Sequence, residues 1–301
     1  MYNQQFLHAP NTFANSHCLY PFADPVVNQG QMKVIALSNQ TSITQVQGEN
    51  KVAWCNIIRA TDYPGVVPAD LGGDYGSDAE LYVMRVTYQK SRDAFPVYYL
   101  PWAPNAAFRM KLKPSPNHPT QEGFFFKDTV EPAVFITAPL QGCSIIASGE
   151  AHEPVLYHLN AQAVQGLNGE MIGSPNDNDV QAAAQAKSDH MMARYNVARH
   201  EKAKEGPKTD GERPTQNYNS QAVHIRDYMD NALGTRLPLL RNHYLRGARG
   251  AVDQYGTVFG VRTGTNWEFF RQTRTRVCVY GATKRLDKST WVDPVSVRFW
   301  P

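Results

Sequence analysis

A cysteine and a histidine stand fifteen residues apart in the stretch FITAPLQGCSIIASGEAHEPVLYHLNA, residues 135–161. Cys143 follows a Pro/Gly turn and opens the apolar run CSIIAS, while His158 lies in the next apolar run. A thiol has a pKa of about 8.5, and an adjacent imidazolium lowers it toward physiological pH. The thiolate would attack a carbonyl carbon, and the imidazolium would protonate the departing amine. The pair therefore suggests acyl transfer, and a buried apolar cysteine is the alternative interpretation.

Two short strand patterns joined by GEAHE predict a β-hairpin around this pair. If the turn centres between Glu150 and Ala151, Cys143 lies directly opposite His158. Side chains directly opposed in an antiparallel pair have Cβ atoms about 4.5–5.5 Å apart, which brings a thiol and an imidazole within reach. A shift of one residue would send them to opposite faces, so this prediction depends on the register.

Neighbouring residues could support the same chemistry. Thr137, six residues before Cys143, could orient the imidazole through its hydroxyl or carbonyl. The turn that contains Leu140 and Gly142 could expose the sulfur and aim backbone N–H groups at a developing oxyanion. Asn160 shares the face of His158 two positions on and could orient it as an alternative to Thr137.

Other histidines and cysteines give competing interpretations. His152 lies in the expected turn, either as a second candidate base or as a solvated turn residue. His243 follows Cys143 by one hundred residues, which leaves a papain-like order of nucleophile and base open. Cys55 and Cys278 lie in apolar strand patterns and are expected in the core. The four scattered cysteines show no metal-ligand spacing, so no metal site is expected.

Strand patterns occupy the early and late parts of the chain. Gly, Pro, Asn and Asp clusters separate β-branched and aromatic runs, which favours a sandwich or mixed sheet over alternating βαβ units. The first thirty residues are expected to be irregular. The expected strands are 32–37, 51–58, 81–88, 95–100, 108–113, 133–138, 143–148, 154–161, 257–262, 274–282 and 295–300.

The middle of the chain has a sequence pattern typical of helices. Apolar residues recur at helical spacing from about Val180, and residues 205–219 resemble an exposed loop. A second helix is expected over 220–233, with Ser220 as its cap and Gly234 at its end. The expected fold class is α+β: one domain, 1–301, with a β-sandwich or mixed-sheet core, helices packed on it and a helical insertion over 168–219.

Composition narrows the class of protein. The chain has 301 residues, of which 42% are hydrophobic and 19% charged, as in globular domains. No stretch approaches eighteen consecutive apolar residues, and the N-terminus lacks the features of a Sec signal peptide, so neither a membrane span nor that export route is expected. Residues 235–301 hold 12 Lys and Arg against 4 Asp and Glu. Such a basic third could bind an acidic protein surface or nucleic acid without any catalysis, although a solvated basic face explains the charge equally well and nucleic acid is the less favoured partner.

The sequence LQGC, residues 140–143, with Thr137 before it and His158 after it, resembles the active site of the cytotoxic-necrotizing-factor family of toxin glutamine deamidases. It is similar also to Burkholderia lethal factor and to the chemoreceptor deamidase CheD. The family pattern is L-x-G-C followed by a catalytic histidine, with a threonine six before the cysteine in several members. The similarity covers about 25 residues, and the segment 168–219 has no counterpart in it.

This resemblance implies a cysteine-dependent protein glutamine deamidase. Cys143 would be the nucleophile, His158 the proton shuttle and Thr137 the third site residue, on a β-sandwich with helices packed against it. The partner would be a glutamine-bearing protein of a host cell, and a primary amine in place of water would give transglutamination. The chain would then be a secreted or translocated bacterial effector that acts in the host cytoplasm, without a cofactor.

Overall fold

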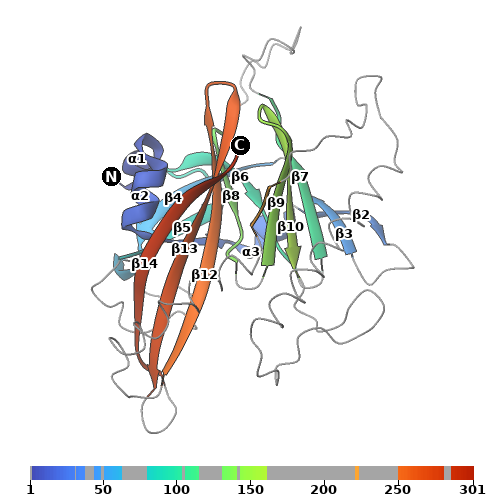
Figure 1. Cartoon of the computed structure of the whole chain (residues 1–301). Coiled ribbons are helices and arrows are strands. Elements are labelled where there is room, and N and C mark those ends of the chain that lie inside the picture. The colour runs from blue at the N-terminus through green and yellow to red at the C-terminus, as the bar shows by residue number, and fades with distance from the viewer. Residues whose placement is uncertain are drawn as a thin grey trace, which may run out of the picture.

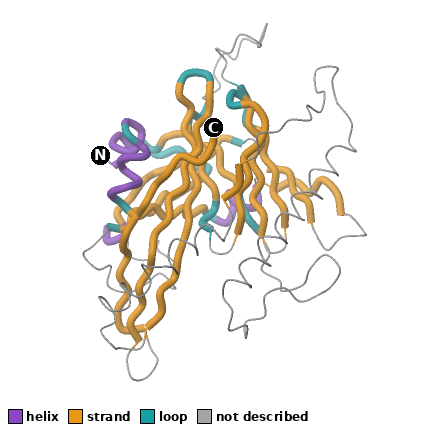
Figure 2. Tube along the Cα trace, in the orientation of Figure 1, coloured by secondary structure: helices purple, strands orange, loops and turns teal. Residues whose placement is uncertain are grey.

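The computed structural model describes residues 2–30, 32–37, 44–48, 51–62, 80–103, 106–114, 131–140, 143–160, 221–223, 250–280 and 286–301. Within these ranges strands dominate, and the helices are short (Figure 2). The helices are α1 (Tyr2–His8), α2 (Pro10–Ser16), α3 (Pro25–Gly30) and one 3₁₀ turn, η1 (Ala60–Asp62). None of these helices is long and apolar enough to cross a membrane.

The first sheet has eight strands in the order β1-β5-β4-β6-β8-β12-β13-β14. β1 runs parallel to β5 and β6 runs parallel to β8, while the other neighbours are antiparallel. β12, β13 and β14 extend well beyond the other strands (Figure 1). The bounds are β1 (Cys18–Ala23), β4 (Val52–Arg59), β5 (Leu81–Thr87), β6 (Phe95–Leu100), β8 (Val134–Thr137), β12 (Gly250–Thr263), β13 (Asn266–Tyr280) and β14 (Leu286–Trp300).

The second sheet has six strands in the order β11-β9-β10-β7-β3-β2. Its centre is the hairpin of β9 and β10, flanked by β7 on one side and by the short β11 on the other. β3 continues the sheet parallel to β7. The bounds are β2 (Met32–Leu37), β3 (Thr44–Gly48), β7 (Ala106–Lys111), β9 (Cys143–Glu150), β10 (Glu153–Asn160) and β11 (Gln221–Val223).

The two sheets share one apolar layer, here called the interlayer cluster. It combines residues of the first sheet with residues of the second, so the sheets pack face to face over this region. Its buried members are Tyr98, Leu100, Phe108, Met110, Leu112, Phe135, Leu140, Cys143, Ile145, Ala147, Leu156, Val258, Trp267, Phe269 and Trp300.

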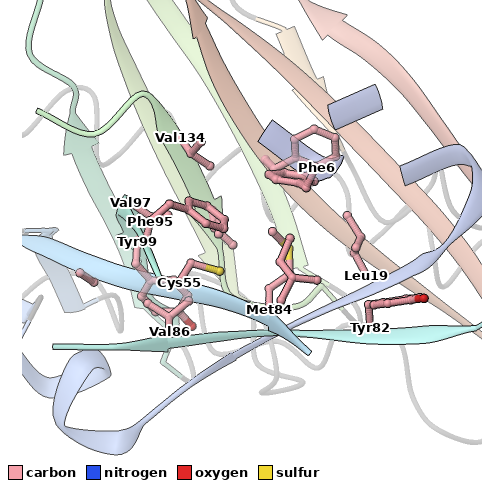
Figure 3. Packing of buried hydrophobic residues seen from close by; sticks show 14 of the residues in the cluster. Phe6, Leu19, Cys55, Tyr82, Met84, Val86, Phe95, Val97, Tyr99 and Val134 are labelled. Atoms are coloured by element: carbon pink, nitrogen blue, oxygen red, sulfur yellow. The ribbon is translucent and has the colours of Figure 1, made fainter. Parts of the chain in front are cut away.

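On the other face of the first sheet, apolar side chains of its strands and of the N-terminal helices pack into a second core (Figure 3). Phe6 of α1 is fully buried and meets the rings of Phe13, Phe95 and Phe259. Because β6 presents Tyr98 to the interlayer cluster and Tyr99 to this second core, both of its faces are buried. The apolar patterns of the central strands follow from this burial on two sides.

Polar side chains of α2 and β13 join the N-terminal segment to the last strands of the first sheet. The Gln272 amide donates to the carbonyls of Ala14 and His17, and its oxygen accepts from the Leu19 N–H at 2.8 Å. Asn15 bonds both the N–H and the carbonyl of Ser296 on the outer edge of β14. Asn15 thus takes the place of a neighbouring strand at that position and covers part of an open sheet edge.

The α+β expectation is wrong. The described residues are mostly strand in curled, mixed sheets, with three short α-helices near the N-terminus. The expected helix over 220–233 is also wrong at its start, because 221–223 form β11 against β9. The first thirty residues, expected to be irregular, form α1, α2, β1 and α3. The predicted insertion at 168–219 lies outside the described residues.

Candidate functional site

The β9–β10 hairpin turns at Ala151 and His152, so that Glu150 pairs with Glu153. In this register Cys143 lies opposite Asn160, and His158 lies opposite Ile145. The expected direct opposition of Cys143 and His158 is therefore wrong. The turn lies one residue further along the chain than expected, which moves each partner by two positions.

A shift of two positions keeps every side chain on its own face of the sheet. Cys143 and His158 remain on one face, as diagonal neighbours, where Cβ atoms lie roughly 7–8 Å apart. The face is the one that carries Cys143, Ile145 and Leu156 into the interlayer cluster. His158 is fully buried, and Cys143 keeps 5% of its surface exposed.

The imidazole of His158 has polar atoms in apolar surroundings. Neither Nδ1 nor Nε2 has a hydrogen-bond partner among the described residues. Burial lowers the pKa of His158 to about 3 from its usual 6.5, because the apolar surroundings disfavour the charged ring. A buried polar group without a partner costs about 1–3 kcal/mol. His158 is therefore a buried polar group that packing alone does not explain.

Thr137 lies in the other layer, at the end of β8. It is two residues beyond Phe135 and beside Leu100 in the parallel pair, both members of the interlayer cluster, so it stands on the same inner face. Its side chain is fully buried, and its hydroxyl donates to the Ala138 carbonyl at 2.9 Å. The structure thus brings Thr137 to the layer that holds Cys143 and His158, but no hydrogen bond joins it to the imidazole.

The three oxyanion and orienting candidates have different outcomes. Leu140 is fully buried, its N–H donates to the Gly256 carbonyl at 2.8 Å, and its own carbonyl accepts from Gly256 at 2.9 Å. Its N–H is therefore engaged and does not point at an oxyanion. Gly142 lies outside the described residues. Asn160 is placed by its backbone directly across from Cys143, and its side chain is not among those described.

The competing histidines do not meet Cys143 in the described structure. His152 is in the turn at the far end of an eight-residue strand, on the order of 25 Å from Cys143. His243 lies outside the described residues. None of the four cysteines forms a disulfide in the described structure, and Cys55 and Cys278 are core residues as expected. Burial raises the pKa of the Cys55 thiol, which makes it a poor nucleophile.

Two residues that the sequence analysis did not single out enclose His158. Phe108 of β7 lies opposite it on one side and Ile145 of β9 on the other, and both are fully buried. Alternation of apolar residues at 108, 110 and 112 marks the inner face of β7 in the sequence. That β7 is the neighbour of β10 could not be read from this pattern, because the pairing joins distant segments.

Several described arginines in residues 235–301 are buried or paired with carboxylates within the fold. Arg274 is fully buried, with its guanidinium within 6 Å of the rings of Tyr20, Tyr255 and Trp291, and Arg276 is also buried. Arg262 and Arg298 pair with Glu131 and Glu268. In the described part of β12–β14, Arg274 and Arg276 are thus buried and not available to a docking face, whereas the side chain of Arg298 is half exposed.

No protein-family model matches the chain, and no curated protein matches it. The function is therefore argued from the arrangement of Cys143, His158 and Thr137.

Proposed function

We propose that this protein is a cysteine-dependent amidohydrolase that converts a glutamine side chain of a partner protein to glutamate. Cys143 is the nucleophile and His158 is the base. The observation that carries the proposal is the fully buried, unpartnered imidazole on the same hairpin face as the thiol. The glutamine substrate comes from the resemblance of the Thr137, Leu140–Cys143 and His158 pattern to toxin deamidases.

The reaction begins with both groups neutral. As the Cys143 sulfur attacks the carboxamide carbon, an imidazole nitrogen of His158 takes the thiol proton and a C–S bond forms. The imidazolium gives this proton to the amide nitrogen, the C–N bond breaks and ammonia leaves. Water attacks the thioester while the imidazole takes one of its protons. That proton returns to sulfur, which leaves a glutamate carboxyl and a free thiol.

The diagonal placement requires one adjustment before the first step. The imidazole must turn toward Cys143, which is the first residue of β9 and so stands at a strand end. Catalytic hydrogen bonds are often long or absent without substrate and tighten in the complex. Because both ring nitrogens lack partners, this rotation breaks no existing hydrogen bond.

The cellular setting follows the same resemblance. The partner is a host protein with an accessible glutamine, and the chain is a secreted or translocated effector that acts in the host cytoplasm. A primary amine that replaces water at the thioester would transfer the glutaminyl group to that amine. Burial of Arg274 and Arg276 does not favour the alternative in which the basic third is a binding surface without catalysis.

Mass spectrometry of treated lysate tests this function. Host-cell and bacterial lysates are incubated with wild type, with Cys143→Ala or with His152→Gln, and digests are searched for Gln-to-Glu conversion. Wild type and His152→Gln should convert the same sites, since His152 lies at the far end of the hairpin. Conversion that persists with Cys143→Ala, or none with wild type in any lysate, would refute the proposal.

A further inference from the structure

His158 occupies a slot between two apolar side chains on neighbouring strands. Phe108 and Ile145 share its rung across the sheet, one on each side, and both have no exposed surface. Directly opposed side chains in adjacent strands have Cβ atoms about 4.5–5.5 Å apart. The ring of Phe108 and the branched chain of Ile145 therefore flank the imidazole and exclude water from it.

Few ionisable groups face this slot. On the inner face, β7 presents Phe108 and Met110, and Leu112 follows directly after its end, all apolar. β9 presents Cys143 as its one ionisable group. Across the interlayer cluster the first sheet presents Tyr98, whose hydroxyl donates to Glu131 at 3.0 Å, and Glu131 in turn pairs with Arg262. Among the described residues, no carboxylate stands where it would stabilise an imidazolium in the slot.

We propose that Phe108 is a positioning residue for the reaction: with Ile145 it keeps the resting imidazole of His158 neutral, so that the imidazolium forms only during the reaction, beside the thiolate or oxyanion that compensates its charge. This inference rests on the proposed function for its catalytic meaning. The pair then works by general-base catalysis and not through a resting thiolate–imidazolium ion pair. Burial as the cause of the lowered His158 pKa agrees with this assignment.

The consequence is a reaction that tolerates acid. His158 is neutral, and so able to act as a base, at any pH above its own pKa in the folded protein. That pKa lies well below 6.5. Deamidation should therefore lose no rate through His158 protonation between pH 7 and pH 5. An ordinary histidine would become mostly protonated over the same range.

A matched pair of substitutions tests Phe108 specifically. Valine and threonine have nearly the same shape, so Phe108→Val and Phe108→Thr leave similar space beside the imidazole. Only threonine adds a hydroxyl that can accept a hydrogen bond from the charged ring. The His158 titration is followed by NMR on the full chain with labelled histidine, and His158→Gln identifies its signal. The acidic limb of the deamidation rate is measured in parallel.

Wild-type His158 should have its titration midpoint below pH 5. Phe108→Val should raise the midpoint only slightly, because valine is apolar but lets some water reach the ring, and Phe108→Thr should raise it by about one pH unit or more above that of Phe108→Val. The acidic limb of kcat should move with it. A wild-type midpoint near 6.5, or equal midpoints in the two variants, would overturn the inference. If neither variant folds, Ile145→Val against Ile145→Thr carries the same comparison from the other side of the ring. Failure of the proposed function would be seen separately. Deamidation would then persist in Cys143→Ala, although the titration midpoint of His158 stayed well below pH 6.5.

Discussion

Cys143 and His158 lie on the same face of the β9–β10 hairpin, on adjacent diagonal positions of its ladder and not on one rung. Both face the layer between the sheets, where Thr137 also stands. The arrangement joins a nucleophile type and a base type at one end of a hairpin, inside an otherwise apolar core. No hydrogen bond joins the imidazole of His158 to the thiol in this arrangement, so the titration of His158 is the property to measure.

Alkylation should identify Cys143 as the most reactive thiol. It keeps 5% of its surface exposed, while Cys18 and Cys55 keep none and Cys278 keeps 2%. Iodoacetamide added to the native protein should label Cys143 several times faster than any other cysteine, as read by peptide mapping against time. Cys143→Ala should remove the fast phase. If Cys278 were labelled faster than Cys143, the position of Cys143 at the start of β9 would not make its thiol more reactive.

Acid should destabilise the folded protein through His158. The unfolded histidine binds a proton below pH 6.5, whereas the folded one stays neutral to about pH 3. Between these values the free energy of unfolding should fall by up to about 1.4 kcal/mol per pH unit as the pH is lowered. His158→Leu should lose this part of the dependence. Urea denaturation of both proteins at pH 7, 6 and 5 measures the difference, and parallel pH dependences would contradict the burial of a neutral imidazole.

Gln272 should be essential for joining the N-terminal segment to the last strands of the first sheet. Its side chain satisfies the Ala14 and His17 carbonyls and the Leu19 N–H. Gln272→Ala leaves these groups without that partner and should lower the free energy of unfolding by roughly 2–4 kcal/mol. The exposed Gln89→Ala should change it by less than about 0.5 kcal/mol in the same chemical denaturation. An equal effect of the two substitutions would refute this role.

Gly260 should be intolerant of a side chain. It pairs with Phe269, and a Cβ at Gly260 would stand 2.5 Å from Cε1 of that ring. Gly260→Ala should destabilise the protein by about 1–3 kcal/mol through overpacking. In a Phe269→Leu background the same substitution should cost clearly less, because the clashing ring is gone. Additive effects in a double-mutant cycle would show that the ring is not the obstacle.

Local patterns in the sequence identified many of the strands. The runs at 32–37 and 95–100 coincide with β2 and β6, and the run at 81–88 overlaps β5 almost completely. Alternation and β-branching report burial directly, so such segments are readable. The late strands β12, β13 and β14 are all longer than expected, with 14, 15 and 15 residues, because the parts outside the expected runs carry polar residues such as Asp253, Glu268 and Lys288 and do not look apolar.

The sequence predicted the shared face of Cys143 and His158 but not their register. Turn composition located the hairpin, yet GEAHE allows several turn positions, and the structure uses Ala151 and His152. The neighbours of His158 were beyond the sequence, because Phe108 reaches it through a pairing between segments about fifty residues apart. The helices α1 and α2 were missed since their stability comes from Phe6 and Phe13 in the core and not from helix propensity.

The measurement that tests the central claim most directly is the deamidation rate of the single variants Cys143→Ala and His158→Gln and of their double variant. Ammonia release and Gln-to-Glu conversion are followed on the same lysate proteins. If Cys143 and His158 act as one unit, each single substitution should reduce the rate to the background of the double variant, with no further loss on combining them. Circular dichroism and unfolding curves establish that all three variants are folded. A folded single variant that keeps the wild-type rate would contradict the account.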